Sequence, residues 1–341
     1  MTISHENSND QHSSQALVLG LRPPQPSLSC VIPCYNEAKN LEQLLPMMSE
    51  TLAALSPAWE LILVDDGSTD ATALVLAKWA QQPGFKAIFL SRNFGKEAAL
   101  SAGLQASQGD VVVMMDGDLQ HSGDLIGTFM QKWREGADVV YAVREHRRDE
   151  SRFKRWGTDL FYALVNAADR FEVPAGAGDF RLMDRRVVNA LLSLPERNRF
   201  MKGLYAWVGF NAVAVPYMPN ERGHGSSHFS AMRLIRFSLD GLTAFTTLPL
   251  RAVSLLGFAL AVMAFLYGFF RTVTYFLYGS DVSGWTTIVV SLMLFAGIQM
   301  ISLGIVGEYI GRVFEEVKGR PLYVVKHELG SGLPDRTSEP R

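Results

Sequence analysis

The sequence predicts an α/β protein in which a doubly wound, mostly parallel sheet is followed by two transmembrane helices. Short β-branched runs alternate with helical stretches between residues 28 and 228, and these runs are apolar throughout, as in strands covered on both faces. Two uncharged stretches nearer the C-terminus are each long enough to cross a hydrocarbon core of about 30 Å. The composition, with 48% apolar residues, a net charge of -2 and two cysteines, excludes a disordered chain, a general nucleic-acid binder and a disulfide scaffold.

The elements of the sheet domain follow from apolar periodicity and from the turn residues between the runs. They are, in chain order, strand Ser29–Pro33, helix Asn40–Leu55, strand Glu60–Val64, helix Thr69–Ala80 capped by Ser68 or Thr69, strand Lys86–Leu90, helix Lys96–Ala106, strand Asp110–Met115 and strand Asp138–Tyr141. Residues 1–27 are polar and lack the apolar core of a signal peptide, so we expect a disordered tail that lies in the cytoplasm. The predicted catalytic domain is 28–228.

The C-terminal third is predicted to be attached to a membrane. Residues 229–248 combine apolar and basic side chains at helical spacing, which favours amphipathic helices on a membrane surface over an ordinary packed helix. Residues 249–275 and 282–307 are the predicted transmembrane helices, and 308–341 are a tail. Basic residues precede the first predicted transmembrane helix and follow the second. The positive-inside rule therefore predicts that the catalytic domain and both termini are cytoplasmic.

Acidic side chains follow two of the predicted parallel strands at the point where each strand ends. Asp65 and Asp66 follow one strand, and Asp116 and Asp118 follow another. Ligands of such sheets bind at the carboxyl ends of the strands, so all four carboxylates are expected in one crevice. Asp116 and Asp118 are suited to a hard divalent cation that also binds substrate phosphates, whereas Asp65 and Asp66 are suited to the base or ribose of a nucleotide. Neither a G-x-G-x-x-G nor a G-K-[ST] motif is present, which disfavours a dinucleotide site and a P-loop.

Two further segments carry candidate functional residues. The run from Arg144 to Arg155 is rich in arginine, which binds phosphate in a forked geometry, although a solvated helix face has the same composition. Asp179 follows a glycine-rich stretch that can direct its side chain into a site, and a helix cap is the alternative interpretation.

Taken together, six motifs resemble family-2 glycosyltransferases of the GT-A fold, and among them the polyprenyl-phosphate glycosyltransferases. The motifs are Val31-Ile32-Pro33-Cys34-Tyr35-Asn36-Glu37, Val64-Asp65-Asp66-Gly67-Ser68, Ser91-Arg92-Asn93-Phe94-Gly95-Lys96, Asp116-Gly117-Asp118-Leu119-Gln120-His121, Gly178-Asp179-Phe180-Arg181-Leu182-Met183 and Gly307-Glu308-Tyr309-Ile310-Gly311-Arg312. They extend over nearly the whole of residues 28–325. The resemblance covers bactoprenol glucosyltransferases and dolichyl-phosphate mannose synthase.

The resemblance implies a role for each matching residue. It assigns Pro33, Tyr35, Glu37, Asp65, Asp66, Lys96 and Asp116 to the nucleotide-sugar, Asp116, Asp118 and Gln120 to a Mg²⁺ or Mn²⁺ ion, Arg144 and Arg155 to the acceptor phosphate, and Asp179 with Asp118 to catalysis. Because a phosphate monoester is already ionised near pH 7, with a second pKa of about 6, the attacking group needs little help from a base. We therefore expect Asp179 mainly to orient other groups.

The implied reaction is an inverting transfer of a sugar, with UDP-glucose as the first expectation, to undecaprenyl phosphate at the cytoplasmic face of the inner membrane. The product would serve modification of cell-envelope glycans such as lipopolysaccharide, and the resemblance also implies a homotetramer. GDP-mannose and UDP-linked amino sugars are alternative donors. Two other functions compete with this one. The first is a processive polysaccharide synthase, which is expected to have more transmembrane helices and a Q-x-x-R-W motif. The second is a non-enzymatic membrane protein that binds nucleotide-sugars.

Overall fold

The computed structural model describes part of the chain, in two compact units. The described residues are 22–119, 123–144, 177–197, 199, 201–218, 248–278 and 284–333. The first unit contains the sheet and takes in the described residues up to 218 together with 321–333. The second contains the described residues from 248 to 320.

The first unit is built on one mixed sheet of eight strands in the order β7-β5-β6-β4-β1-β2-β3-β8. The strands are β1 (Leu28–Cys34), β2 (Trp59–Asp65), β3 (Phe85–Leu90), β4 (Val111–Met114), β5 (Val139–Arg144), β6 (Ala177–Asp184), β7 (Ala212–Tyr217) and β8 (Val325–Leu329). Strands β4, β1, β2 and β3 are parallel to one another, β6 is antiparallel to β4 and β5, and β8 is antiparallel to β3. The predicted α/β fold with its parallel central strands is confirmed.

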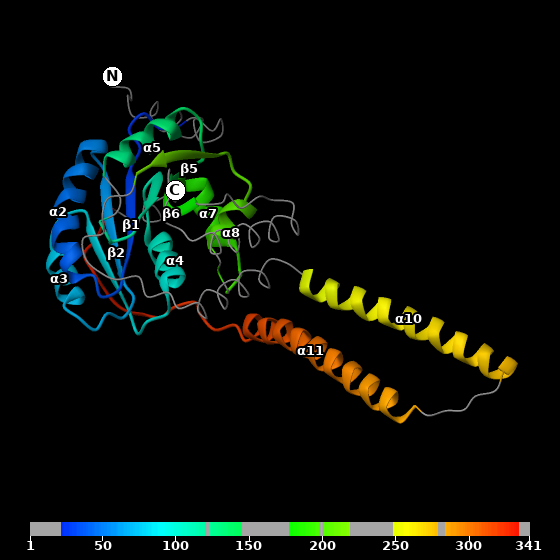
Figure 1. Ribbon diagram of the computed structural model, residues 1–341. Coiled ribbons are helices and arrows are strands. Elements are labelled where there is room, and N and C mark those ends of the chain that lie inside the picture. The colour runs from blue at the N-terminus through cyan, green and yellow to red at the C-terminus, as the bar shows by residue number, and fades with distance from the viewer. Residues whose placement is uncertain are drawn as a thin grey trace, which may run out of the picture. The chain divides into compact units, whose positions relative to one another are not determined.

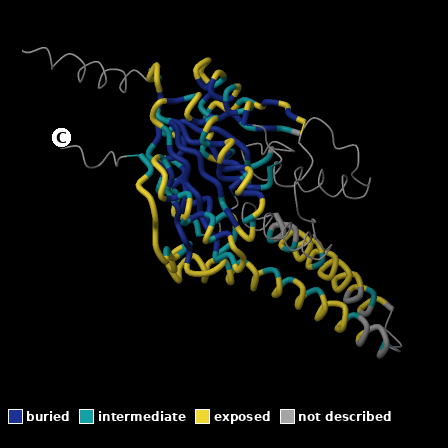
Figure 2. The backbone as a smooth tube through the Cα atoms, turned by 90° about the vertical axis from the view of Figure 1, so that its left-hand side faces the viewer, coloured by how far each residue is buried: buried dark blue, intermediate teal, exposed yellow. Residues whose placement is uncertain are grey.

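Helices lie on both faces of this sheet (Figure 1). They are α2 (Ala38–Leu55), α3 (Thr72–Trp79), α4 (Lys96–Ala106), α5 (Asp124–Arg134), α7 (Arg185–Ser193) and α8 (Met201–Trp207). Successive side chains of β1 point to opposite faces of the sheet. Cys30 and Ile32 belong to the core that α2 and α5 cover, whereas Val31 points toward α4. The central strands are therefore buried on both sides, as Figure 2 shows, which explains why their sequences are continuously apolar.

Helix α4 approaches the sheet closely at Gly103. A Cβ atom at this glycine would lie 2.2 Å from Cγ1 of Val31 and 3.2 Å from Cγ2 of Val64. Both valines are buried and stiff at χ1, so they cannot move aside easily. The close approach packs α4 directly against β1 and β2.

We expect Gly103→Ala to lower the free energy of unfolding by about 1–3 kcal/mol, because the added methyl group overpacks this contact. Gly127→Ala on α5 is the matched control, since its Cβ would meet only Cδ2 of Leu55 at 3.7 Å. That variant should gain up to about 1 kcal/mol from helix propensity. Urea unfolding followed by tryptophan fluorescence measures both. A Gly103→Ala protein as stable as the wild type would contradict this packing.

Helix α3 begins later than the sequence predicts, at Thr72 instead of Thr69, and neither Ser68 nor Thr69 caps it. These two residues are bound by another turn: the hydroxyl of Ser68 accepts from the amide of Asn36, and the amide of Thr69 donates to Oδ1 of Asn36. Asp70 instead accepts from the amide of Thr72 at 2.9 Å. The cap residues predicted from local sequence therefore link the β1–α2 turn to the β2–α3 turn.

Strand β8 is formed by residues that sequence analysis placed in a tail. The amide of Ser91 donates to the carbonyl oxygen of Val324 at 2.9 Å, and Phe89 stacks on His327 with ring centroids 4.4 Å apart. The buried carboxylate of Glu60 accepts from the amide of Leu333 at 2.9 Å. The chain thus returns to the edge of the catalytic sheet after its last long helix.

The second unit contains the long helices α10 (Leu248–Tyr278) and α11 (Trp285–Val317). By length and composition both can cross a membrane: Val253–Phe270 has a mean hydropathy of 2.2 and Ser291–Val317 one of 1.5, and neither window is buried by protein. Helix α11 continues ten residues beyond the predicted end of the second span at residue 307. The predicted amphipathic segment 229–248 lies outside the described residues except for its last position.

Candidate functional site

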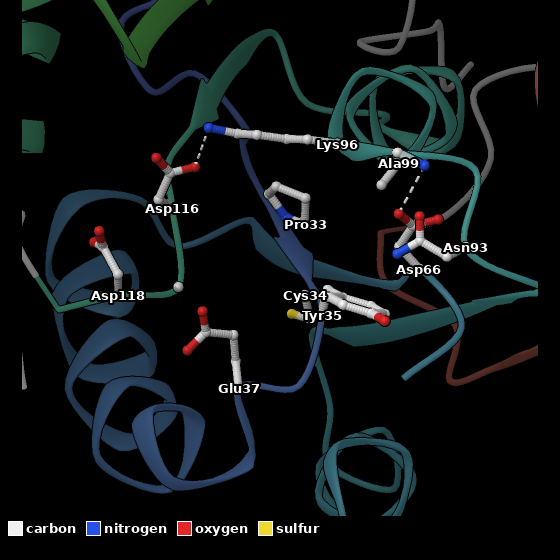
Figure 3. A pocket seen from close by; sticks show the side chains of 12 residues that line it. Pro33, Cys34, Tyr35, Glu37, Asp66, Asn93, Lys96, Ala99, Asp116 and Asp118 are labelled. Carbon is white, nitrogen blue, oxygen red and sulfur yellow. Dashed lines mark hydrogen bonds and ion pairs between the residues drawn. The ribbon is translucent and has the colours of Figure 1, made fainter. Parts of the chain in front are cut away.

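A cavity of about 410 Å³ opens at the carboxyl ends of β1, β2 and β4 (Figure 3). It is lined by Pro33, Cys34, Tyr35, Glu37, Asp66, Asn93, Gly95, Lys96, Ala99, Asp116, Gly117 and Asp118. The acidic motifs predicted to share one crevice thus do so, with the exception of Asp65. The carboxylate of that residue is buried and accepts from the amide of Ser68 at 3.1 Å, so it supports the turn after β2.

Asp66 shapes one wall of the cavity. Its Oδ1 accepts from the amide of Phe94 at 2.7 Å and its Oδ2 from the amide of Gly95 at 2.9 Å. Burial raises the pKa of Asp66, and the two amide hydrogen bonds oppose this effect. Gly67 makes the close approach possible, because its φ is +69° and a Cβ there would lie 2.5 Å from the carbonyl carbon of Arg92. Asp66 therefore holds the loop before α4 in place as well as lining the cavity.

The turn from β1 into α2 supplies a second wall. Asn36 adopts a left-handed backbone conformation with φ of 56°, which Asn tolerates better than most residues. Tyr35 remains 47% exposed at the opening, a suitable place for a ring that stacks on a ligand. Glu37 accepts a short hydrogen bond from the amide group of Asn40. Burial raises the pKa of Glu37, and Asp118 and Asp116 add to the increase, since their carboxylates face the same opening.

Asp116 and Asp118 follow the buried strand β4 and could hold a divalent cation. Leu119 directly after them has φ of 62°, a costly conformation for a bulky residue and one that is found mainly at functional sites. In the described part of the chain, no three acidic, histidine or cysteine side chains are grouped as metal ligands. The two carboxylates of Asp116 and Asp118 fit Mg²⁺ or Mn²⁺, because a magnesium-type ion takes one or two protein carboxylates and completes its shell with substrate phosphates and water.

Lys96 joins two carboxylates that are far apart in the sequence. Its Nζ lies 2.7 Å from Oδ1 of Asp116 and 2.6 Å from Oδ2 of Asp179. Arg181 of β6 is opposite Met114 of β4, so Asp179 lies just beyond the paired residues, at the end of β4 where Asp116 follows. Asp179 is thus on strand β6, which pairs antiparallel with β4, and not at the helix cap that was the alternative interpretation of the sequence.

The ionisation of Asp179 is set by its neighbours. Burial raises its pKa, but Lys96, and then Lys202 and Arg181, outweigh this effect and hold the pKa of Asp179 below its usual value. Its Oδ1 is buried and has no hydrogen-bond partner among the described residues. A carboxylate with a low pKa is a weak base, so the arrangement supports an orienting role.

Sequence analysis did not single out the charged residues beside Asp179. Arg181 is buried with its guanidinium 3.4 Å from the ring centroid of Tyr205. Burial raises the pKa of Glu97 to about 7, and the charge of Asp179 adds to this increase. In the sequence, only its place directly after Lys96 pointed to Glu97 as a site residue. That place does not reveal that the carboxyl group is buried.

The raised pKa of Glu97 predicts a pH-dependent stability. The folded-state pKa of about 7 lies above the ordinary glutamate value of 4.5, so the folded chain binds this proton more tightly than the unfolded chain does. Stability is therefore lost as the pH rises from about 4.5 to 7. Glu97→Gln removes this loss and should be more stable than the wild type at pH 8, by on the order of 3 kcal/mol, and only slightly so at pH 5.

Urea unfolding at pH 5, 6, 7 and 8 measures this difference. Glu135→Gln, which changes an exposed carboxyl group on the surface beside α5, is the matched control and should show no comparable gain above pH 5. If the advantage of Glu97→Gln were the same at all four pH values, Glu97 would not titrate in this range.

Three predicted site residues cannot be placed. Gln120 and Arg155 lie outside the described residues, and for Arg144 the structure describes the backbone, which ends β5. The predicted sites for the acceptor phosphate and for the third metal ligand therefore stay predictions.

The chain is similar to known glycosyltransferases. The sequence model of the family described as "Glycosyl transferase family 2" matches residues 29–192. An uncharacterized glycosyltransferase of Synechocystis sp. is 44% identical over 304 residues, which are 89% of this chain and 96% of that protein. The SfII prophage-derived bactoprenol glucosyl transferase of Shigella flexneri is 39% identical over 304 residues, 88% of this chain and 97% of that protein.

Among solved structures, similarity is found to glucosyl-3-phosphoglycerate synthase from Mycobacterium tuberculosis, in complex with Mn²⁺, uridine diphosphate and phosphoglyceric acid. The identity is 19%, the match covers 65% of this chain and 82% of that chain, and the TM-score is 0.44.

Proposed function

The chain belongs to glycosyl transferase family 2, and on this premise we propose that it transfers a sugar from a nucleotide-sugar donor to a polyprenyl phosphate in a membrane. One observation carries the proposal: the match to the bactoprenol glucosyl transferase covers 88% of this chain and 97% of that protein. A match of that length in a chain of 341 residues must include strands β2 to β7, α10 and about the first half of α11.

The cavity supports a nucleotide-sugar as the donor. Tyr35 and Pro33 offer an apolar surface for the base, and Glu37 and Asp66 lie beside them with carboxylates that can accept from base or ribose. Asp116 and Asp118, with Gln120 as the predicted third ligand, would hold a Mg²⁺ or Mn²⁺ ion that acts as a Lewis acid toward the departing diphosphate. UDP-glucose is the proposed donor, with GDP-mannose and UDP-linked amino sugars as alternatives.

The two apolar helices support a lipid acceptor. A polyprenyl phosphate stays in the bilayer with its head group at the surface, so a catalytic domain tethered by two spans meets it there. We propose that α10 and α11 cross the inner membrane, with the catalytic domain and both termini in the cytoplasm, because basic residues flank the pair on its outer sides. An oxygen of the acceptor phosphate attacks the anomeric carbon with inversion, the bond between that carbon and the donor's diphosphate oxygen breaks, and the nucleoside diphosphate leaves with the bonding electrons. Arg144 and Arg155 are the proposed ligands of the acceptor phosphate. We also propose that the protein forms a homotetramer.

The test is a donor panel. The full chain in detergent is given undecaprenyl phosphate, MgCl₂ or MnCl₂, and radiolabelled UDP-glucose, GDP-mannose or UDP-N-acetylglucosamine. Label that enters the organic phase with only one donor supports the proposal and identifies the sugar. Label in a water-soluble polymer would indicate a processive synthase, and nucleotide-sugar binding without transfer from any donor would indicate a non-enzymatic protein.

A further inference from the structure

The ammonium group of Lys96 lies where negative charge is concentrated at the mouth of the cavity. Lys96 is the first residue of α4 and is 42% exposed, whereas Asp116 is 31% and Asp179 16% exposed. The side chain extends across the cavity to Asp116, and the ion pair is drawn in Figure 3. The same nitrogen also binds Asp179. One lysine therefore links the ends of β4 and β6.

Lys96 is the cation whose Nζ contacts the carboxylates of both Asp116 and Asp179. The positive charges of Lys202 and Arg181 also act on Asp179. The carboxylates of Asp116 and Asp179 raise the pKa of Lys96 against the effect of burial, so the ammonium stays protonated at neutral pH.

The ammonium and a dication would compete for the same carboxylate. Nζ of Lys96 is 2.7 Å from Oδ1 of Asp116, and a magnesium-type ion takes a carboxylate oxygen at about 2.0–2.1 Å. Two cations that share one oxygen at these distances lie within about 5 Å of each other and repel strongly in a partly buried site. A donor diphosphate would supply new negative charge for the ammonium to bind.

We infer that Lys96 is a resident counter-ion that occupies Asp116 in the free protein, opposes binding of the dication alone, and passes to the donor's diphosphate when dication and nucleotide bind together. This inference rests on the proposed function for its ligands. It makes Lys96 a residue that couples the two binding events, so that the cation binds tightly only with the nucleotide.

This role predicts effects of opposite sign. Lys96→Met removes the competing cation, so Mn²⁺ alone should bind about tenfold more tightly than to the wild type. The same change removes a partner of the diphosphate, so UDP in the presence of saturating Mn²⁺ should bind about tenfold more weakly. Lys96→Arg keeps the charge and should stay within about threefold of the wild type for Mn²⁺ alone. A residue with a purely structural role would weaken both ligands.

The experiment titrates the full chain in detergent with MnCl₂, with and without UDP, and follows free Mn²⁺ by electron paramagnetic resonance. Lys96→Gln is measured together with Lys96→Met, so that the test remains possible if one of the two variants does not fold. Lys132→Met is the matched control, because this lysine on α5 forms an exposed pair with Glu135 and lies outside the cavity. Its two affinities should equal those of the wild type.

Tighter Mn²⁺ binding without UDP, combined with weaker UDP binding, supports the inference. Unchanged or weaker Mn²⁺ binding in Lys96→Met and Lys96→Gln overturns it. The titration uses neither acceptor nor sugar, so it is independent of the transfer assay: a wild type that transfers sugar while the variants gain no Mn²⁺ affinity refutes only this inference. A gain in Mn²⁺ affinity in a protein that transfers no sugar refutes only the proposed function.

Discussion

Asp118→Ala should abolish cation-dependent sugar transfer, with a fall in kcat/KM of about a thousandfold or more. Asp116 and Asp118 are the carboxylates of the cavity that we propose as ligands of the dication, and Asp116 already contacts Lys96. Loss of Asp118 leaves the developing charge on the departing diphosphate without its main neutralising partner. The measurement is the initial rate of label transfer to undecaprenyl phosphate over a range of MgCl₂ concentrations.

The control for this variant is Asp124→Ala, an exposed aspartate at the start of α5. It should keep the activity and the cation dependence of the wild type. Asp118→Ala with the same rate and the same Mg²⁺ dependence as the wild type would refute the metal assignment, and the cavity would then need another explanation for its paired aspartates.

Asp179→Asn should lower kcat by about a hundredfold, and raising the pH should not restore it. The pKa of Asp179 is held below its usual value, chiefly by Lys96 against the effect of burial, and the acceptor phosphate is already ionised near pH 7. The loss therefore comes from a misplaced Lys96, whose Nζ is 2.6 Å from Oδ2 of Asp179. A proton acceptor in a rate-limiting step would behave differently, because a higher pH would compensate for its absence.

The pH–rate profile from pH 6 to 9.5 makes this distinction. Asp179→Asn should run parallel to the wild type at a lower rate, and Asp124→Asn should superimpose on the wild type. A deficit that disappears fully at high pH would instead assign Asp179 as the general base.

The central strands and several helices were predictable because their signals are local. Helix α4 has the bounds that its composition predicts, Lys96–Ala106, and the strands around Val31, Val64 and Val113 are continuously apolar because both of their faces are buried. The acidic motifs were also predictable, since the carboxyl ends of parallel strands meet at one edge of a sheet.

Contacts between distant segments were not predictable in the same way. Ser68 and Thr69, which were expected to cap a helix, form hydrogen bonds with Asn36 instead. Residues that were expected in a tail form β8 beside β3. A hydrogen bond to a residue more than thirty positions away leaves no periodic pattern in the sequence. Local propensity therefore assigned these residues to the wrong partners.

The sequence by itself determined the α/β class, the crevice of acidic side chains and the two apolar helices, because each depends on periodicity or composition within a short window. Only the tertiary structure decided that the ammonium group of Lys96 binds both Asp116 and Asp179, although Asp179 is 83 positions away in the sequence. It also decided that the carboxyl group of Glu97 is buried near them. Ionisation and ion pairing depend on distance and on exclusion of water, and both arise only when β4, β6 and α4 pack together.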